Sequence, residues 1–136
     1  MIPRLPVPTA VADTSVWIEP PIEGLIAYAD ETTVTIVTVA ELEYGSHVSD
    51  PVRALARRRR LRAIVERFDV LPLDVQGAEV YGAMAEAVRS AGRSPPPRRF
   101  DLLIAAIAAR HGLPVLTRDR SGFTDLERLV TVVQVG

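Results

Sequence analysis

Short runs of β-branched and aliphatic residues alternate with longer helical patterns along the chain. This alternation predicts a parallel sheet covered by helices, because parallel strands need a crossover connection that is usually a helix. The expected strands are residues 9–12, 33–37, 70–73, 113–117 and 129–135. Pro72 places the third of them at a sheet edge, since proline cannot donate a ladder hydrogen bond. The predicted fold class is α/β, with a central, mostly parallel sheet of four to five strands.

Residues that begin and end helices separate the predicted strands. The expected helices are residues 20–29, 38–47, 51–68, 74–92 and 100–110. Asp50 before Pro51 is a typical N-cap followed by proline at the first helical position, and Asp74 caps the next helix. Three successive prolines predict a loop over residues 93–99, because proline does not fit a helix interior.

The composition limits the class of protein. The 136 residues fit one domain spanning residues 1–136, and the absence of cysteine excludes a thiolate metal site and a cysteine nucleophile. The apolar runs are shorter than a membrane span requires, and three prolines interrupt the N-terminal segment, which therefore does not resemble a signal peptide. We expect a cytoplasmic protein that does not bind membranes. A net charge of −1 provides no general attraction for nucleic acid.

Acidic residues follow the predicted strands at comparable places. Asp13 comes directly after the first strand, Glu41 lies near the start of the helix after the second, and Asp119 follows the fourth strand by one residue. Binding crevices form at the carboxyl ends of parallel strands. Asp101 begins the alanine-rich helix, whose small side chains allow a close approach to the sheet.

Four converging carboxylates would need a cation. Two carboxylates about 4 Å apart repel each other by roughly 4 kcal/mol at an effective dielectric constant near 20. A cluster that offers oxygen ligands alone favours Mg²⁺ or Mn²⁺, and such an ion promotes phosphodiester hydrolysis. Each acid also has an ordinary structural explanation: Asp13 and Asp119 as turn or cap residues, Glu41 as the N3 residue of a capping box begun by Thr38, and Asp101 as a first-turn acid favoured by the helix dipole.

The acidic segments resemble the PIN-domain ribonucleases, and specifically the VapC toxins of bacterial VapBC toxin–antitoxin pairs. The similar segments contain the four acids in order, and they are residues 11–18, 38–45, 100–108 and 115–119 with Phe123. The resemblance covers nearly the whole chain. It implies a three-layer α/β/α sandwich and an Mg²⁺- or Mn²⁺-dependent endoribonuclease acting as a toxin.

The resemblance also implies residue roles and partners. Asp13, Glu41, Asp101 and Asp119 would be the catalytic, metal-holding residues, and Ser15 and Thr117 would orient metal-bound waters. The expected partners are a VapB-like antitoxin, an RNA substrate such as tRNA or rRNA, and a second copy of the chain in a homodimer. Family members often have Asp or His just before the residue equivalent to Phe123, where this chain has Gly122.

Gly122 keeps a second interpretation open, in which the chain is a catalytically weak PIN-like module that binds RNA or a partner. An aspartate-based phosphatase fits poorly, because Ser15 stands where a second acid would be needed. A receiver domain would require a lysine, and the chain has none.

All 16 basic residues are arginine, whose planar guanidinium suits phosphate groups. Arg98, Arg99, Arg118 and Arg120 flank two of the acids and are the candidates for gripping RNA phosphates near the metal. Five further arginines crowd into residues 57–62. They could follow RNA phosphates, pair with acids of a partner, or form a solvated helix face.

Overall fold

The computed structural model describes residues 3–136. Five strands form one parallel sheet in the order β3-β2-β1-β4-β5. In chain order they are β1 (Val7–Ala12), β2 (Ala29–Thr35), β3 (Val70–Leu71), β4 (Val115–Thr117) and β5 (Val132–Gln134). The predicted sheet is confirmed, with β3 at an edge as Pro72 indicates.

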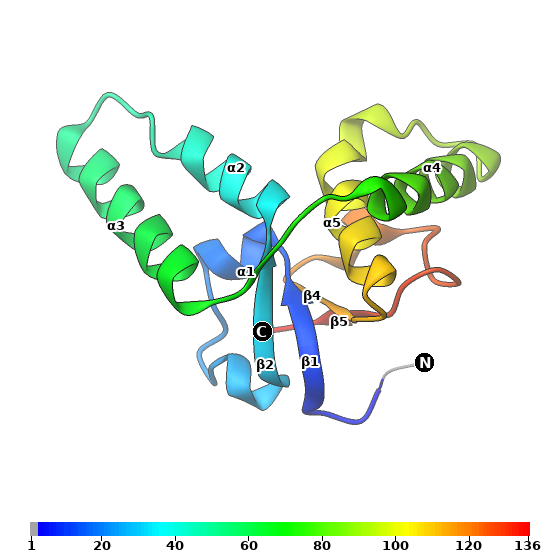
Figure 1. Ribbon diagram of the computed structural model, residues 1–136, viewed down its shortest axis with the longest axis horizontal. Coiled ribbons are helices and arrows are strands. Elements are labelled where there is room, and N and C mark those ends of the chain that lie inside the picture. The colour runs from blue at the N-terminus through cyan, green and yellow to red at the C-terminus, as the bar shows by residue number, and fades with distance from the viewer. Residues whose placement is uncertain (1–2) are drawn as a thin grey trace.

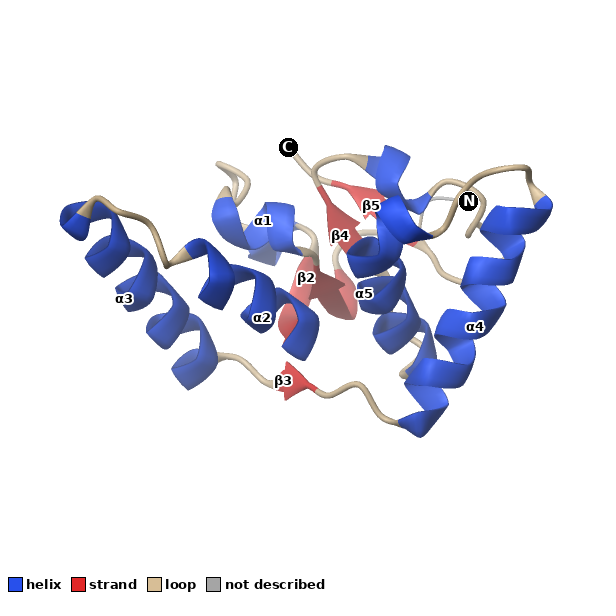
Figure 2. Cartoon of the chain, turned by 90° about the horizontal axis from the view of Figure 1, so that it is seen from above, coloured by secondary structure: helices blue, strands red, loops and turns tan. Residues whose placement is uncertain are grey.

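Helices cover both faces of the sheet, so the three-layer architecture is also confirmed. Figure 2 shows α1, α2 and α3 on one side of the strands and α4 and α5 on the other. The helices are α1 (Thr14–Ile18), α2 (Ile36–Gly45), α3 (Pro51–Arg67), α4 (Val75–Ser90) and α5 (Arg99–Arg110). The short 3₁₀ helices are η1 (Leu25–Ala27), η2 (Pro96–Arg98) and η3 (Arg120–Phe123).

The alternating side chains of the central strands build two cores. Val11 and Val115 point to the face where α4 and α5 pack. Ala10, Ala12 and Leu116 point to the opposite face, where they meet α1 and α3. Most of the alanine-rich helix α5 is buried, because its small side chains allow it to lie directly on the sheet. The two cores fix the sheet between its helical layers.

The chain reverses its direction across the sheet between β1 and β4. Strands β2 and β3 are added on one side of β1, whereas β4 and β5 follow on the other. Figure 1 shows β2 and β4 on opposite sides of β1. Val11 pairs with Val115 and Ala12 with Leu116, so the two strands end together. In an open parallel sheet this switch point is where a crevice forms at the carboxyl ends of the strands. The residues that follow β1 and β4 are therefore placed at the natural position for a site.

The helix predicted over residues 20–29 is wrong. The structure instead begins a helix directly after Asp13, whose Oδ1 accepts a hydrogen bond from the Val16 amide at 3.2 Å and so caps α1. Pro20 and Pro21 follow that helix, and only the short η1 forms before β2. An N-cap aspartate at the end of a strand is sufficient to start the helix earlier than the prolines suggest.

The helix predicted to start at Thr38 begins two residues earlier, at Ile36, and strand β2 correspondingly ends at Thr35. The Thr35 hydroxyl accepts from the Thr38 amide at 3.1 Å and is the true N-cap. Ile36 and Val37 are β-branched and resemble a strand in sequence, but tertiary packing overrides that preference. Glu41 therefore lies in the second turn of α2, and its predicted position in a capping box is wrong.

Other boundaries are closer to expectation. Asp50 and Asp74 cap α3 and α4 as predicted. Gly112 ends α5 with a φ of 68°, and the Leu113 amide donates back to the Ala108 carbonyl, as in a Schellman motif. The proline segment forms η2 rather than an irregular loop, and β4 and β5 are shorter than the predicted strands. Within residues 3–136, the structure contains no helix that is sufficiently long and apolar to cross a bilayer.

Candidate active site at the carboxyl ends of the strands

Asp13 is held from three directions. It follows β1 and is only 4% exposed. Its Oδ1 accepts from the Val16 amide and, at 2.6 Å, from the Ser15 hydroxyl, while its Oδ2 accepts from the Thr117 hydroxyl at 2.6 Å. These contacts leave the carboxylate little freedom to rotate. The buried acid is therefore fixed at the switch point between β1 and β4.

Ser15 and Thr117 connect the two strand ends. Beyond its bond to Asp13, the Ser15 Oγ accepts from the Arg118 amide at 3.2 Å, and the Thr117 Oγ1 accepts from the Asp119 amide at 3.2 Å. In this arrangement both hydroxyls hold Asp13 itself. The role in orienting waters that the resemblance implies is a prediction that these contacts do not test.

Glu41 reaches the site from α2. Its Oε1 accepts a hydrogen bond from the Thr14 hydroxyl at 2.6 Å, and the Thr14 Oγ1 lies 2.9 Å from the Thr38 Oγ1. Thr14 belongs to α1, so this chain of hydroxyls joins the helix after β1 to the helix after β2. The sequence alone did not identify Thr14 or Thr38 as site residues. Thr14 adjoins Asp13 and Thr38 lies three residues before Glu41, but only the tertiary structure shows that the two threonines meet.

Asp101 carries the clearest electrostatic signature of the site. It lies in the first turn of α5 and is half-buried. Its pKa is raised to about 6, first by burial and then by the charges of Asp13, Glu41 and Asp119, against the opposing charge of Arg98. A group repelled by three acids is a functional-site candidate with a physical basis. All four predicted acids therefore interact electrostatically around Asp101.

Gly122 lies directly against Asp101. A methyl group built on Gly122 would overlap the Asp101 Oδ2 and would stand 3.1 Å from its Cγ. The backbone of η3 lies so close to this carboxylate that a side chain at position 122 would force Asp101 to move. An Asp or His at this position, as the resemblance leads one to expect, would require the Asp101 carboxylate to turn away.

Asp119 is the exposed member of the group. Its Oδ1 accepts from the Ser121 amide at 2.9 Å, which makes Asp119 the N-cap of η3. Hydrogen bonds from the backbone and side chain of Ser121 lower the pKa of Asp119. The residue thus combines the turn role predicted for it with a place at the site.

Two of the four flanking arginines are engaged inside the protein. Arg98 donates to the Gly122 carbonyl at 2.8 Å and to the Thr124 carbonyl at 2.6 Å, and so ties η3 to the start of α5. Arg118 donates to the Glu19 carbonyl at 3.0 Å and pairs with its carboxylate. Arg99, which lies over the ring of Phe100, and Arg120 are exposed. Of the four, Arg99 and Arg120 are the side chains most accessible to a ligand.

The donor set suits a hard divalent cation. The four acids offer only carboxylate oxygens, His47 and His111 are exposed on other segments, and the chain has no cysteine. Within residues 3–136, no three carboxylate or imidazole groups are close enough to form a ready-made metal cage. A spread set of this kind fits an ion held partly through water, the mode that Mg²⁺ prefers.

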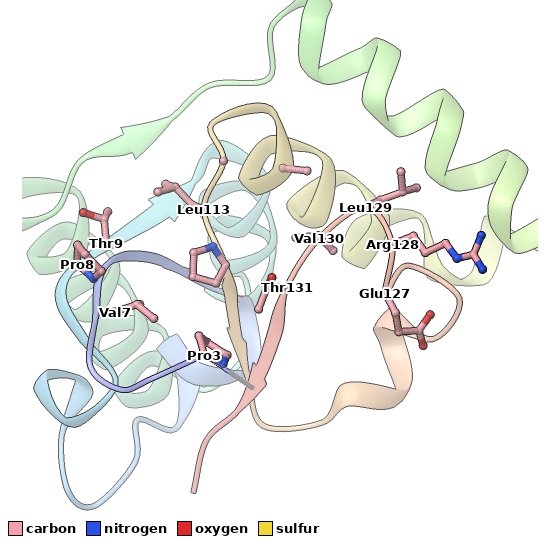
Figure 3. Close-up of a pocket in the computed structure, with 13 residues that line it drawn as sticks. Pro3, Val7, Pro8, Thr9, Leu113, Glu127, Arg128, Leu129, Val130 and Thr131 are labelled. Atoms are coloured by element: carbon pink, nitrogen blue, oxygen red, sulfur yellow. The ribbon is translucent and has the colours of Figure 1, made fainter. Parts of the chain in front are cut away.

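A pocket lies at the other end of the sheet from the four acids. It has a volume of about 580 Å³ and opens at the amino ends of β1, β4 and β5, among residues that include Val7, Leu113 and Thr131. Figure 3 shows these side chains around the pocket, with Arg128 extending away from them. None of the four acids lines it, so it is not the candidate active site.

The fold and the acids together define a class: a parallel α/β protein with four acids near its topological switch point. The chain matches the family model for the PIN domain over residues 10–129. This chain belongs to the PIN-domain family, and the resemblance to VapC proteins is confirmed.

Two curated relatives come from Mycobacterium tuberculosis. The chain is 34% identical to the protein named Ribonuclease VapC4 over 115 residues, which cover 81% of this chain and 85% of that protein. It is likewise 34% identical to Ribonuclease VapC5 over 114 residues, covering 80% and 82% of the two chains.

Solved structures agree with this assignment. The VapBC-5 toxin–antitoxin structure from Mycobacterium tuberculosis matches with a TM-score of 0.80 and 30% identity, covering 95% of this chain and 98% of that chain. The FitAcB structure from Neisseria gonorrhoeae matches at 0.72 with 24% identity, covering 92% and 96%. At that identity the second match supports the fold alone.

Proposed function

We propose that this protein is a metal-dependent endoribonuclease that acts as the toxin of a toxin–antitoxin pair. The observation that carries the proposal is the gathering of four acids at one switch point. Asp13 is held there by Ser15 and Thr117, and Glu41 is held by Thr14. Asp101 lies close enough to the other three acids for their charges to add to the larger effect of burial on its pKa. The naming of both curated relatives as ribonucleases supports the same chemistry.

Asp13, Glu41, Asp101 and Asp119 would hold Mg²⁺ or Mn²⁺, directly or through water. The ion, when bound, lowers the pKa of a water molecule and neutralises charge on the phosphate being cleaved. Asp13 is already oriented by Ser15 and Thr117, and Glu41 by Thr14. Preorganised ligands of this kind need little reorganisation during the reaction. Arg99 and Arg120, whose side chains are exposed, would contact neighbouring phosphates of the RNA.

Metal removal provides the first test. We expect cleavage of RNA in the presence of Mg²⁺ or Mn²⁺ and none in excess chelator, with activity returning when the metal is added back. Gel analysis of a labelled tRNA or rRNA fragment measures this result. Undiminished cleavage in chelator would contradict the proposal. Tight RNA binding without metal-stimulated cleavage would favour the catalytically weak module, for which Gly122 is the specific observation.

Gly122→Ala should lower cleavage by at least about tenfold, because the new methyl group displaces Asp101 from its position and even a small misplacement of a reacting group is costly. Gly82→Ala is the matched control, since a methyl group there meets no atom within 4 Å. Initial rates of both variants, compared with wild type at equal Mg²⁺, give the measurement. Equal rates for Gly122→Ala and Gly82→Ala would show that the close approach is unimportant.

We also propose a VapB-like antitoxin as partner and a homodimer as the assembled state. An apolar groove of about 720 Å³ between α2 and α5, next to Glu41, supports a protein partner. Ile36, Tyr44 and Phe100 are exposed in it, with Tyr44 84% exposed, and such patches commonly mark interfaces. Co-purification of the chain with the product of the adjacent gene tests the partner. A free, fully active protein without such a companion would argue against it.

A further inference from the structure

Positive charge is concentrated on helix α3. Its seven arginines and single glutamate give this helix a formal charge of +6 in a chain whose net charge is −1. Within residues 3–136, no ion pair involves an arginine between positions 57 and 67. The charge of α3 is therefore largely available to a ligand. Figure 2 shows α3 as the outermost helix on its side of the sheet, beside α1 and α2.

Two adjoining depressions lie between α3 and the helices that carry the active site. The first, of about 370 Å³, is lined by Thr14 of α1, by Glu41 of α2, and by Arg57 and Arg60 of α3. The second, of about 450 Å³, continues from Arg60 to Arg67. Ile18 and Arg60 line both depressions. The two depressions therefore adjoin at these residues, and we refer to them together as the α1–α3 groove, which extends from Glu41 along α3.

Only some of the α3 arginines face this groove. Arg57, Arg60 and Arg67 line it, whereas Arg58 and Arg62 do not. The three lining residues are spaced by three and seven positions, which keeps them near one face of the helix over a rise of about 15 Å. The guanidinium of Arg57 donates to the Gly45 carbonyl at 2.7 Å and so lies fixed near the Glu41 end.

Between these arginines the floor of the groove is apolar. Ile18 is 53% exposed there, and Leu25 and Ala63 are half-buried in the same lining. A row of cations beside apolar side chains suits a strand with a charged backbone and flat, unpaired bases. An intact duplex would turn its bases away from this floor.

We propose that the α1–α3 groove binds the single-stranded part of the RNA substrate as it leaves the acidic site. The inference rests on the proposed function, which places the scissile phosphate beside Glu41. Because the groove starts at that residue, an RNA strand entering it brings its next phosphates to Arg57, Arg60 and Arg67 in turn. The bases then lie against Ile18 and its apolar neighbours.

A pair of matched double variants tests this inference. Arg60→Ala with Arg67→Ala removes two groove arginines, and Arg58→Ala with Arg62→Ala removes the same charge from outside the groove. Arg57 is left intact because it contacts α2. Both pairs are made in the full chain with Asp101→Asn to prevent cleavage. Binding of a mixed-sequence single-stranded RNA of about twenty nucleotides is measured by fluorescence anisotropy over a range of salt concentrations.

The groove pair should weaken binding by about tenfold or more and reduce the slope of log K against log salt by about 1.4, since each lost contact with a single strand contributes about 0.7. The control pair should change the Kd by less than about threefold. Circular dichroism confirms that both variants remain folded.

Other results would overturn the inference in distinguishable ways. Equal losses in the two pairs would mean that the charge acts without a defined groove. A groove pair that binds RNA normally but loses a co-purified antitoxin would assign the groove to an acidic peptide. In both cases wild type still cleaves RNA, so the proposed function survives. If wild type neither cleaves nor binds RNA, the proposed function fails as well.

Discussion

Asp13→Asn is expected to lower RNA cleavage by at least about a hundredfold while the protein remains folded. The substitution removes a negative charge from the proposed metal site, and metal-ion catalysis contributes several kcal/mol to reactions of this type. Initial cleavage rates at saturating Mg²⁺, measured beside the thermal unfolding midpoint, give the two readouts.

The local structure can accept asparagine at this position. Asparagine is as good an N-cap as aspartate, so its Oδ1 still accepts the hydrogen bond from the Val16 amide that caps α1. The new amide group of the asparagine can donate a hydrogen bond to the Thr117 Oγ1. The Thr117 hydroxyl can then donate its own proton to the Asp119 carbonyl, which is 3.1 Å away. We therefore expect the free energy of unfolding to change by no more than about 1 kcal/mol.

Asp30→Asn is the control for this experiment. It removes the same charge from an exposed position at the start of β2, away from the carboxyl ends of the strands, and should leave the rate unchanged. Retention of cleavage by Asp13→Asn to within about threefold of wild type would exclude Asp13 from the catalytic site.

Asp101→Asn should have opposite effects on activity and stability. Cleavage is expected to fall at least about a hundredfold, because a second proposed metal ligand is lost. The metal-free protein should become more stable by about 1 kcal/mol at pH 7.5, a value reduced for the partial exposure of the side chain. In a chain of this size the unfolding midpoint rises by about 3–5 °C. No hydrogen bond to the Asp101 side chain within residues 3–136 would be lost.

The raised pKa of Asp101 explains why removing its charge should stabilise the protein. Asp101 has a pKa of about 6 in the folded protein against an ordinary value of 3.8, so the folded state binds its proton more tightly than the unfolded chain does. Ionisation therefore destabilises the fold as the pH rises from about 4 through 6, and the cost is fully present above pH 6. The advantage of Asp101→Asn should be present at pH 7.5 and disappear as the pH falls towards 4.

Thermal unfolding curves across this pH range, recorded in chelator, measure the effect. Addition of Mg²⁺ should then raise the unfolding midpoint of wild type more than that of Asp101→Asn. A ligand stabilises the folded state more when it binds more tightly, and wild type keeps all four proposed ligands. A variant less stable than wild type at pH 7.5 without metal would contradict the repulsion inferred around Asp101.

Local sequence signals predicted much of the fold because their physical causes are local. Asp50 and Asp74 cap the helices predicted for them, and Pro72 lies beside the edge strand. The start of α2 was misplaced because Ile36 and Val37 prefer strands by side-chain shape, and only the Thr35 cap and the packing of α2 decide otherwise.

The sequence by itself determined that an acid comes at or soon after the end of several strands. Parallel strands necessarily bring their carboxyl ends to one edge of the sheet. That reasoning was enough to identify Asp13, Glu41 and Asp119 as candidates, and Asp101 was identified by its place at the start of the alanine-rich helix. Only the tertiary structure decided how these acids are held, because the decisive contacts join residues far apart in the chain: Thr14 with Glu41, Thr117 with Asp13, and Gly122 with Asp101. Hydrogen bonds and steric contacts act over a few ångströms, and no local pattern encodes which distant residue will come that close.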